Sequence, residues 1–523
     1  MRKTFALSLI LIISITINAQ SFHVSKKESD IYKTAFIKRL TEINLLGQDE
    51  NYVYYDFTPY HEVFGKSEGL PTAHYIAKVS KDLRDHIKNP IDFGRKNNYS
   101  VKKIIYLNNQ IYAIKIDKGE INAYKINKSD ISLSGKHKLL MKNIVDGSII
   151  GNLSFITSED QTKLMVFYFI YNSNNVPKRF GIRVYDEDLE LLWVNEQIKP
   201  EFKNGIFNFE NFRVQNDGDV YFIGAISQSG EKATFRRGDH INKKTIFRID
   251  NPGEHFQIYH LYDEGEEIES INLDLNIYYI RDMNYYINSS GKVWIYGVYC
   301  TEEQVSALGT FIAKVNFDNE TIDEIEFKKF NEDLISRDYN KRELEFFNKH
   351  YENDEWDGFH YNISKLKTRK DGTHYFVSEK WLRGYYHDTN VAMTDYLYED
   401  LYITSVEFDK GITQNFKISK RQYAALYKNI CSYSIIESEK GSYFLFNNFT
   451  HPTTPMQKDG TTKIVLIDSE GNQTEKIIEP KIKNLDRIYM STTFVQLSPT
   501  EFMIGRQSLQ HKFQSYVKMK IEE

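Results

Sequence analysis

The chain has little cysteine and little proline, and it carries no excess of positive charge. Two cysteines among 523 residues exclude a disulfide scaffold, and Cys300 and Cys431 lie too far apart in the sequence for a CxxC-type metal or redox motif. Both stand in apolar, strand-like runs, which favours two separate buried thiols over one disulfide. Lys and Arg number 67 against 72 Asp and Glu, so the concentrated basic footprint of a nucleic-acid-binding protein is missing.

Long apolar runs are absent beyond the N-terminus. Arg2 and Lys3 precede the apolar stretch Phe5–Ile17, and Ala19 offers a small residue for cleavage, which is the order of a secretory signal peptide. The alternative, a membrane anchor, is disfavoured because a bilayer span needs roughly 20 apolar residues. We therefore expect a signal peptide over residues 1–19, no transmembrane segment in the mature chain, and export to the periplasm or the cell exterior.

Aromatic residues, in contrast, are plentiful, and 37 Tyr and 34 Phe suit the pleated, half-buried surfaces of β-strands. One hairpin pattern recurs along the chain: an apolar run, a polar turn that holds glycine, and an aromatic-rich run. The clearest copies are FRVQNDGDVYFIG at 212–224, YYINSSGKVWIYG at 285–297, KLKTRKDGTHYFV at 365–377 and SIIESEKGSYFLF at 434–446. Such recurrence predicts stacked copies of one antiparallel unit.

Most copies of the hairpin are followed by a third run that ends in an acidic turn and then by a fourth, short run. The third run alternates strictly in IAKVNF at 312–317 and in ITSVEF at 403–408, which is strand behaviour. Four antiparallel strands in a repeated unit are the arrangement of a β-propeller blade. The sequence therefore predicts an all-β fold, a β-propeller of about eight four-stranded antiparallel blades, with these approximate spans: 36–90, 101–145, 150–200, 207–275, 280–330, 358–420, 430–480 and 488–523.

The eighth unit has no outer strand of its own in this interpretation. We expect a segment near residues 22–31 to supply that strand and close the ring, because closure removes exposed sheet edges. Two alternatives stay open: a seven-bladed ring with one misassigned unit, and two smaller β domains. The expected organisation is a single propeller domain over residues 20–523.

One segment breaks the β pattern. Residues 331–350, NEDLISRDYNKRELEFFNKH, are highly charged and rich in helix formers, with Leu334, Leu344 and Phe347 placed to line one helical face. We expect a short helical insertion over about residues 331–357, between units five and six. It is interpreted first as a decoration that covers a blade edge, and alternatively as a functional lid.

The stretch 361–448 resembles part of an uncharacterised group of exported propeller-like proteins from Gram-negative bacteria. The resemblance rests on KTRKDGTHYFVSEKW, ITSVEFDKGITQNFKISKRQ and GSYFLFNN, which place a strand pair ending in Glu, an acidic turn with Gly and a Lys-x-Gln ending in that order. The matching positions here are Glu379, Asp409 to Gly411, and Lys420 to Gln422. The function of this group is unknown, so the resemblance implies no activity.

The repeats do not carry the motifs of several known enzyme classes. The sialidase-type Asp box, S-x-D-x-G-x-x-W, fails at the turn of Gly291, because Ile287 and Ser289 stand at its Ser and Asp positions. A glycosidase needs two carboxylates across a cleft, but no pair can be named from the sequence. No P-loop and no nucleophile elbow in its strand-turn-helix setting occurs, and an acidic stretch at 352–358 lacks the spacing of a calcium loop. We expect no cofactor and no metal, and name no catalytic residue.

Three connecting segments are candidate binding surfaces. The first, EKWLRGYYH at 379–387, is interpreted as a loop whose aromatic and basic residues suit sugar or peptide contact, although packing against a neighbouring blade would explain them too. The second, FRRGDHINKK at 235–244, is the most basic segment. The third, at 449–460, is a long loop constrained by two prolines. The candidate ligand-binding residues are Trp381, Arg383, Tyr385, Tyr386, His387, Arg236 and Arg237.

These observations favour a binding or scaffold module for protein or glycan partners at the cell envelope, and a monomer is the simplest state. The competing hypothesis is a carbohydrate-active hydrolase or lyase with its site in the funnel of the propeller. The enzyme hypothesis requires carboxylates, His or Tyr that converge with perturbed pKa values, whereas the binding hypothesis requires an aromatic surface.

Overall fold

The structure is a computed structural model that contains no ligand. It describes residues 22–29, 32–33, 41–59, 74–93, 101–142, 144–145, 147–171, 177–198, 207–227, 254–275, 278–288, 290–300, 307–331, 334, 356–388, 391–425, 431–449, 459–483, 488–508 and 513–522. The predicted signal peptide lies outside these residues and stays a prediction.

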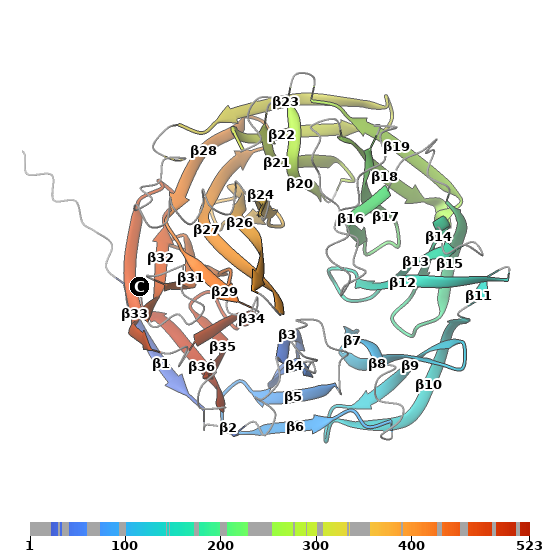
Figure 1. Ribbon diagram of the computed structural model, residues 1–523, viewed down its shortest axis with the longest axis horizontal. Helices are drawn as coiled ribbons and strands as arrows, with labels where there is room; N and C mark the ends of the chain where they lie inside the picture. Colours follow the sequence, from blue (N-terminus) through green and yellow to red (C-terminus); the bar gives the residue numbers. More distant parts are fainter. Residues whose placement is uncertain are drawn as a thin grey trace, which may run out of the picture.

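Eight antiparallel sheets follow one another around a central axis, and the chain passes through them in sequence order (Figure 1). Each sheet is one blade, with its first strand nearest the axis and its last strand at the rim. The all-β propeller of four-stranded blades is thereby confirmed with eight blades, and the seven-bladed alternative is wrong. The predicted spans match the observed blades to within a few residues at most boundaries.

Blades 1 to 4 are ordered from the axis outwards. Blade 1 holds β3 (Thr41–Gln48), β4 (Tyr52–Pro59), β5 (Tyr75–Ser80) and β6 (His86–Pro90). Blade 2 holds β7 (Val101–Leu107), β8 (Gln110–Asp117), β9 (Glu120–Asn127) and β10 (Ser132–Lys142). Blade 3 holds β12 (Ser148–Thr157), with the short β11 (Ile144–Val145) beside it, then β13 (Leu164–Tyr171), β14 (Pro177–Tyr185) and β15 (Leu191–Ile198). Blade 4 holds β16 (Phe207–Val214), β17 (Val220–Ser227), β18 (Glu254–Tyr262) and β19 (Glu267–Leu273), with the 3-10 turn η2 (Asp263–Gly265).

Blades 5 to 8 continue the ring. Blade 5 holds β20 (Tyr279–Ile287), β21 (Val293–Cys300), β22 (Gly309–Asn316) and β23 (Thr321–Lys329). Blade 6 holds β24 (Trp356–Ile363), β26 (His374–Asp388), β27 (Val391–Glu407) and β28 (Gly411–Ile418), with the short β25 (Lys367–Thr368) and β29 (Gln422–Ala425) attached. Blade 7 holds β30 (Ser434–Glu437), β31 (Ser442–Phe449), β32 (Asp459–Ile467) and β33 (Gln473–Lys483). Blade 8 holds β34 (Ile488–Gln496), β35 (Glu501–Ser508) and β36 (Phe513–Glu522).

The outer strand of blade 8 comes from the N-terminal end of the chain. β1 (His23–Glu28) pairs antiparallel with β36, from His23 opposite Glu522 to Glu28 opposite Val517, and β2 (Tyr32–Lys33) pairs with the start of the same strand. The predicted closure by a segment near residues 22–31 is therefore confirmed. The ring is held shut by hydrogen bonds between strands that lie some 490 residues apart in the sequence.

The turns explain why the hairpins form where they do. In several of them an Asp or Asn opens the turn and accepts the backbone N–H groups two and four residues later. Asn288 Oδ1 accepts from Ser290 at 3.0 Å and from Lys292 at 2.9 Å, while Asp186 and Asp468 make the same two contacts in their turns. Gly291 follows with φ of 77°, a value that suits glycine. The side-chain acceptor at the start of the turn and the glycine that takes a positive φ together explain the polar, glycine-containing turn of the repeated hairpin.

The two faces of the ring differ in their connections. In an antiparallel blade, first-to-second and third-to-fourth strand connections meet at one face, which we call the turn face. Second-to-third connections and the links between blades meet at the other, the loop face. Connections at the turn face are mostly tight turns, whereas the three longest connections, 60–74, 228–253 and 330–355, all start and end at the loop face. Since binding residues concentrate on loops held by a rigid scaffold, the loop face is the first place to look for a site.

The core lies between adjacent blades, where apolar side chains of neighbouring sheets interlock. One cluster joins blades 2 and 3 through Leu107, Ile114 and Val166, and another joins blades 4 and 5 through Ile258, Tyr285 and Phe311. Nearer the axis the inter-blade contacts become polar. Examples are Asn211 Nδ2 to Met283 O at 3.0 Å, Tyr361 N to Asp282 Oδ2 at 3.1 Å, Ser491 Oγ to Cys431 O at 2.7 Å and Thr492 Oγ1 to Ile43 O at 2.5 Å.

The predicted helical insertion at 331–357 is not supported. Trp356 and Asp357 belong to β24, and apart from Asn331 and Leu334 the remainder of the range lies outside the described residues. Leu334 packs against the buried Phe330 and Tyr361 and so continues the core at this end of blade 5. Helix propensity is a weak guide that tertiary context overrides, so the composition of the segment alone was not enough to establish a helix.

Cys300 and Cys431 are both buried and not bonded to each other, as the sequence predicted. Burial raises the pKa of each thiol, so neither forms a thiolate at neutral pH in the folded chain. We expect no reaction of the native protein with a chromogenic thiol reagent, and reaction of both thiols once guanidinium unfolds it. Rapid labelling of either cysteine before unfolding would contradict their placement.

Candidate functional site

Blade 6 departs from the other blades at the loop face, because its second and third strands run on beyond the blade. β26 has 15 residues and β27 has 17, and they stay paired from His374 opposite Val406 to Asp388 opposite Val391. In Figure 1 this hairpin extends from blade 6 towards the centre of the ring. The segment 379–387, expected to be a loop, is therefore part of a strand, and its Gly384 is paired with Asp395.

A β-bulge marks the point where the hairpin leaves the blade. Glu379 lies opposite Leu401 and Trp381 lies opposite Tyr398, so that Lys380 alone faces the two residues Glu399 and Asp400. Below the bulge β27 pairs with β28, and above it β27 pairs with β29. The bulge thus marks the point in the six-stranded sheet of blade 6 where the partner of β27 changes from β28 to β29.

A buried ionic network fills the space beside the bulge. Lys420, between β28 and β29, is 1% exposed and forms an ion pair with Glu379, also 1% exposed. Lys420 Nζ also donates to Gln422 Oε1 at 2.7 Å, and Ser432 Oγ donates to the second Glu379 oxygen at 2.7 Å. We call Glu379, Lys420, Gln422 and Ser432 the junction cluster. A buried ion pair of this kind persists only when further hydrogen bonds compensate for lost water, as they do here.

The junction cluster ties blade 6 to blade 7. The Gln422 side chain accepts from the Ser432 N–H at 2.7 Å and donates to the Ser432 carbonyl at 2.9 Å, so it acts like a strand partner. The Arg421 backbone N–H donates to Asn448 Oδ1, and the Arg421 carbonyl accepts from the Phe449 N–H, both at 2.8 Å. The second ion pair at the bulge joins Lys380 Nζ to Glu399 Oε2 at 3.1 Å, and Glu399 is fully buried. The base of the hairpin is therefore fixed from both sides.

The structure assigns a physical role to most of the residues on which the resemblance rested. Glu379, Lys420 and Gln422, separated by about 40 residues in the sequence, meet in the junction cluster. Asp409 to Gly411 lie elsewhere, in the turn between β27 and β28 at the turn face. Sequence reasoning missed Glu399 and Asp400, although two adjacent acids inside the strand-like run YLYEDLYITSV were a signal that the regular alternation breaks there.

Three aromatic rings form a row across the base of the hairpin. His360 of β24, Trp381 of β26 and Tyr398 of β27 are direct cross-strand neighbours. The His360 and Trp381 rings stack with centroids 4.8 Å apart, and those of Trp381 and Tyr398 lie 6.2 Å apart at an angle of 21°. Tyr398 is buried, while His360 and Trp381 are half-buried. Trp381, the first of the predicted ligand-binding residues, thus sits in a supported aromatic surface that is partly open to solvent.

The other predicted binding residues are only partly placed. The backbone of Arg383, Tyr385, Tyr386 and His387 runs in β26, but their side chains lie outside the described residues. Arg236 and Arg237 fall in the connection from β17 to β18, which is outside them altogether, as is most of the proline-containing segment 449–460. The structure therefore brings Trp381 together with His360 and Tyr398, which sequence reasoning did not name, and leaves the two arginines untested.

A buried Asp, Thr and His meet near the loop face of blade 1. His74 Nδ1 lies 3.2 Å from Asp56 Oδ1 and 3.2 Å from Thr58 Oγ1, and all three side chains are buried. A catalytic relay requires the two imidazole nitrogens to face different partners, one orienting acid and one nucleophile. Here both of these contacts are made by Nδ1, so among the described residues the three side chains form a hydrogen-bonded cluster around one imidazole nitrogen.

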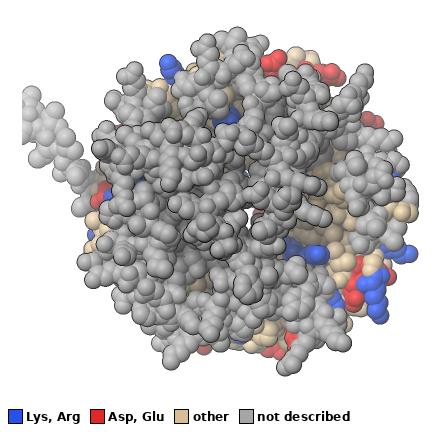
Figure 2. All heavy atoms as spheres, in the orientation of Figure 1, with Lys and Arg blue, Asp and Glu red and all other residues tan. Residues whose placement is uncertain are grey.

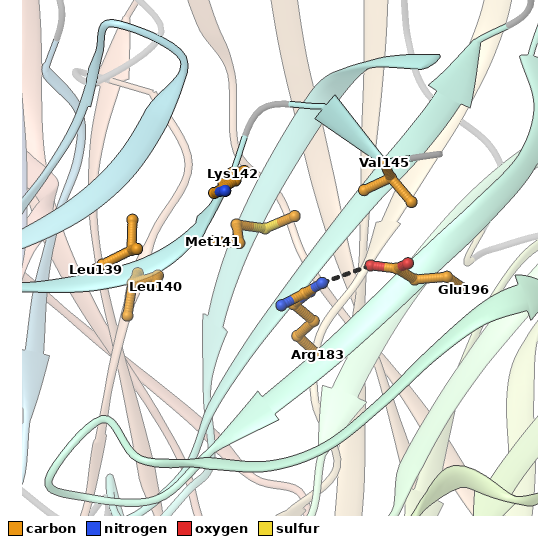
Figure 3. A pocket seen from close by; sticks show the side chains of 7 residues that line it. All are labelled: Leu139, Leu140, Met141, Lys142, Val145, Arg183 and Glu196. Carbon is orange, nitrogen blue, oxygen red and sulfur yellow. Dashed lines mark hydrogen bonds and ion pairs between the residues drawn. The ribbon is translucent and has the colours of Figure 1, made fainter. Parts of the chain in front are cut away.

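An open cavity of about 440 Å³ lies between the rims of blades 2 and 3. Figure 3 shows Met141 and Val145 on one side and the Arg183–Glu196 ion pair, at 2.6 Å, on the other. Glu196 also accepts from the phenol of Tyr168. Because the carboxylate and the guanidinium are paired with each other, these two charges are engaged within the protein, and Lys142 is the remaining charged side chain that lines the groove.

The rest of the described chain shows neither a grouped set of metal ligands nor, on the face seen in Figure 2, a large patch of one charge. Among the described residues no three His, Cys, Asp or Glu side chains are grouped as metal ligands. Where described side chains are visible in Figure 2, Lys and Arg are interspersed with Asp and Glu and form no large patch of one sign. Within the described ranges no helix is long and apolar enough to span a membrane.

Comparisons with known proteins add only distant likenesses. No protein-family model matches the chain, and no curated protein matches it. Among solved structures it is similar to the β-propeller domain of the Trilobed protease from Pyrococcus furiosus, with 11% identity over 84% of this chain and 97% of that one and a TM-score of 0.34. It is also similar to the Synechocystis apocarotenoid oxygenase, with 10% identity over 95% and 93% of the chains and a TM-score of 0.37.

A third similar structure is prolyl oligopeptidase B from Galerina marginata, with 10% identity over 91% of this chain, 56% of that chain and a TM-score of 0.40. Identities near 10% and TM-scores of this size say nothing about the activity of the present protein.

Proposed function

We propose that the protein is an exported β-propeller that binds a protein or glycan partner at the cell envelope, with the extended hairpin of blade 6 as part of the contact surface. The observation that carries the proposal is the aromatic row of His360, Trp381 and Tyr398 on a hairpin that continues beyond its blade. Aromatic side chains dominate recognition energies because they present large apolar area and lose little conformational freedom on binding.

The junction cluster supports this proposal through rigidity. A hairpin held at its base by ion pairs and by Gln422 and Ser432 is already ordered, so a ligand does not have to supply the free energy of ordering it. The acids at the base, Glu379 and Glu399, are engaged by Lys420 and Lys380. Their use in internal ion pairs favours recognition over general acid–base catalysis at this point of the molecule.

Export is part of the same proposal. It is supported by the order of charged, apolar and small residues at 1–19 and by the resemblance to exported propeller-like proteins. The closing strand β1 begins at His23, a few residues after the expected cleavage point, so cleavage after Ala19 would leave that strand intact.

The proposal predicts that Trp381→Ala weakens ligand binding by more than tenfold, which corresponds to about 1.4 kcal/mol. The measurement is a glycan array with the purified mature chain, residues 20–523, followed by titration of the best ligand against wild type and variant. Leu192→Ala is the matched control, since Leu192 is an exposed apolar side chain on the rim of blade 3 and its loss should leave binding unchanged.

Each outcome of this experiment separates the hypotheses. Binding that is unaffected by Trp381→Ala would exclude the aromatic row as the contact surface. An array without any bound glycan would leave a protein partner as the ligand class. Shortened or unsaturated products after incubation with glycans would replace the binding hypothesis by the carbohydrate-active hydrolase or lyase.

A further inference from the structure

Three cations meet near the axis of the ring at the turn face, opposite to the hairpin of blade 6. Arg213 stands at the end of β16, the first strand of blade 4, while Lys365 and Lys367 directly follow β24, the first strand of blade 6. The first strands of all blades surround the axis (Figure 1). Blade 5, which lies between the two, supplies the side chains that connect them.

Arg213 is held in one position by blade 5. Its Nη2 donates to Asn284 Oδ1 at 2.6 Å, and its guanidinium lies over the ring of Tyr285 at 4.4 Å from the centroid. Asn284 Nδ2 in turn donates to the carbonyl of Ile363 at 3.0 Å, two residues before Lys365. The guanidinium is therefore fixed with respect to the segment that carries the lysine.

Lys365 is held just as firmly through its backbone. Tyr296 Oη donates to the Ser364 carbonyl at 3.1 Å and accepts from Leu366 N at 2.8 Å, so both neighbours of Lys365 are bound to one phenol. Ser364 N also donates to Val377 O at 2.8 Å. The side chain of Lys365 itself is exposed to solvent. The result is an exposed amine on a fixed backbone, near a guanidinium that is itself held by hydrogen bonding and ring contact.

The surroundings of Lys365 are partly desolvated and contain two further cations. Desolvation by the surrounding protein lowers its pKa, Arg213 and Lys367 lower it further, and Glu159 opposes the shift. An exposed amine is desolvated in this way when protein surrounds it on several sides while water still reaches it. The three cations therefore act on one another in a shared space and are not isolated surface charges.

Within the described part of the chain, these three charges have no carboxylate at close range. Among the described residues, none lies within 4 Å of the charged nitrogens of Arg213, Lys365 or Lys367, and Glu159 acts only from further away. Elsewhere on the described strands Lys and Arg commonly find a carboxylate, as in the pairs Lys463–Glu475 at 2.8 Å and Lys518–Glu501 at 3.0 Å. Like charges held together without a counter-ion cost free energy, and a bound anion relieves that cost.

We propose that Arg213 and Lys365 form an axial binding site for an oxyanion group, a sulfate, phosphate or carboxylate carried by a small ligand that enters from the turn face. Arg213 offers fixed N–H donors suited to two oxygens of such a group, and Lys365 adds a second cation that can follow it. Lys367 raises the local positive potential. The site is independent of the hairpin of blade 6 and lies on the opposite face.

The first test is calorimetric titration of the mature chain with inorganic sulfate and, separately, inorganic phosphate at low ionic strength, where screening is small. The wild type is expected to bind, and Lys365→Met to bind at least about tenfold more weakly, the loss of one charge-assisted contact. Lys370→Met is the matched control, because Lys370 is exposed in the same turn region but pairs with Glu439 at 3.0 Å. Equal affinity of wild type and Lys365→Met, or no binding of either anion, would overturn the proposal.

The second test measures the chemical reactivity of Lys365 and does not depend on a binding constant. At mildly alkaline pH an amine with a lowered pKa is deprotonated earlier, so Lys365 is expected to be acylated faster than Lys370 by a small amine-reactive reagent, as followed by peptide mass spectrometry. Sulfate should slow the labelling of Lys365 and leave that of Lys370 unchanged. Labelling of Lys365 that sulfate does not slow would refute its role as a ligand to the anion. Acetate, added in place of sulfate, shows whether a carboxylate is accepted too.

Discussion

Lys420→Met is expected to lower the free energy of unfolding by about 3–5 kcal/mol, because it leaves the carboxylate of Glu379 buried without its cation. The lysine also donates to Gln422 Oε1, so the same change removes a charge-assisted hydrogen bond at the joint between blades 6 and 7. The measurement is denaturant unfolding of wild type and variant, followed by tyrosine and tryptophan fluorescence and by circular dichroism.

Two further variants separate the ionic contribution from packing. Glu379→Met combined with Lys420→Met removes both charges, and should recover most of the loss if the unpaired carboxylate causes it. Lys463→Met, which breaks a half-exposed pair on β32, should cost at most about 1 kcal/mol. If Lys420→Met alone is as stable as wild type, the junction cluster does not hold the hairpin.

The same variant links stability to the proposed function. If the junction cluster fixes the base of the hairpin, its loss should speed hydrogen exchange of the backbone amides of β26 and β27 beyond the bulge, while the pairing of β26 with the blade proper below Glu379 is retained. Ligand binding at Trp381 should then weaken through ordering cost, although Lys420 lies below the aromatic surface and is 1% exposed.

The architecture was accessible from the sequence because its signals are local. Most tight turns carry Asp, Asn or Gly at positions that hydrogen bonding and positive φ favour, as at Asn288 and Gly291, and many of the strands between turns alternate with period two. Counting these units located eight blades, and the missing outer strand of the last unit pointed to the N-terminal segment that supplies it. Closure of the ring by the N-terminal strand could be predicted because it follows from the number of strands in each unit and does not depend on side-chain contacts.

The candidate sites were less accessible because they are non-local. Glu379 and Lys420 belong to different strands, and only the bulge at Lys380 and the turn into β29 bring them together. The part of β26 beyond Glu379 is predicted as a loop because its sequence LRGYYH shows no alternation of apolar and polar residues. The segment that links it to its partner strand contains no glycine, so the sequence pattern of a hairpin turn is missing there. Arg213 and Lys365 resemble ordinary charges at strand ends until the ring places them on one axis.

The eighth blade depends on a strand that arrives from the other end of the chain, and this makes the ring sensitive to its N-terminal segment. Phe22 is buried against Tyr443 of blade 7, with ring centroids 5.0 Å apart. Glu28 of β1 forms an ion pair with the buried Arg506 and accepts from Ser515 Oγ at 2.5 Å. Arg506 also reaches Glu479 of blade 7, at 3.4 Å, so one guanidinium joins β1, blade 8 and blade 7.

A chain that starts at residue 31 is therefore expected to lose about 5 kcal/mol or more of unfolding free energy, from the buried phenylalanine and from a buried arginine left without Glu28. It also exposes the hydrogen-bonding edge of β36, which should promote association between molecules. The measurement is denaturant unfolding together with light scattering, on protein produced without the signal segment in both cases.

The missing strand can be supplied as a separate peptide. A synthetic peptide of residues 20–31 should bind the truncated chain and raise its free energy of unfolding as the peptide concentration rises, since a ligand that binds only the folded state stabilises it by mass action. The same peptide with Glu28→Ala should restore less, because the buried Arg506 then keeps only its longer contact with Glu479. Equal stability of the truncated and the mature chain would mean that β1 covers the edge of blade 8 without closing the ring. If the wild-type and Glu28→Ala peptides stabilise the truncated chain equally, strand pairing and burial of Phe22 account for the stabilisation, and the ion pair of Glu28 does not contribute.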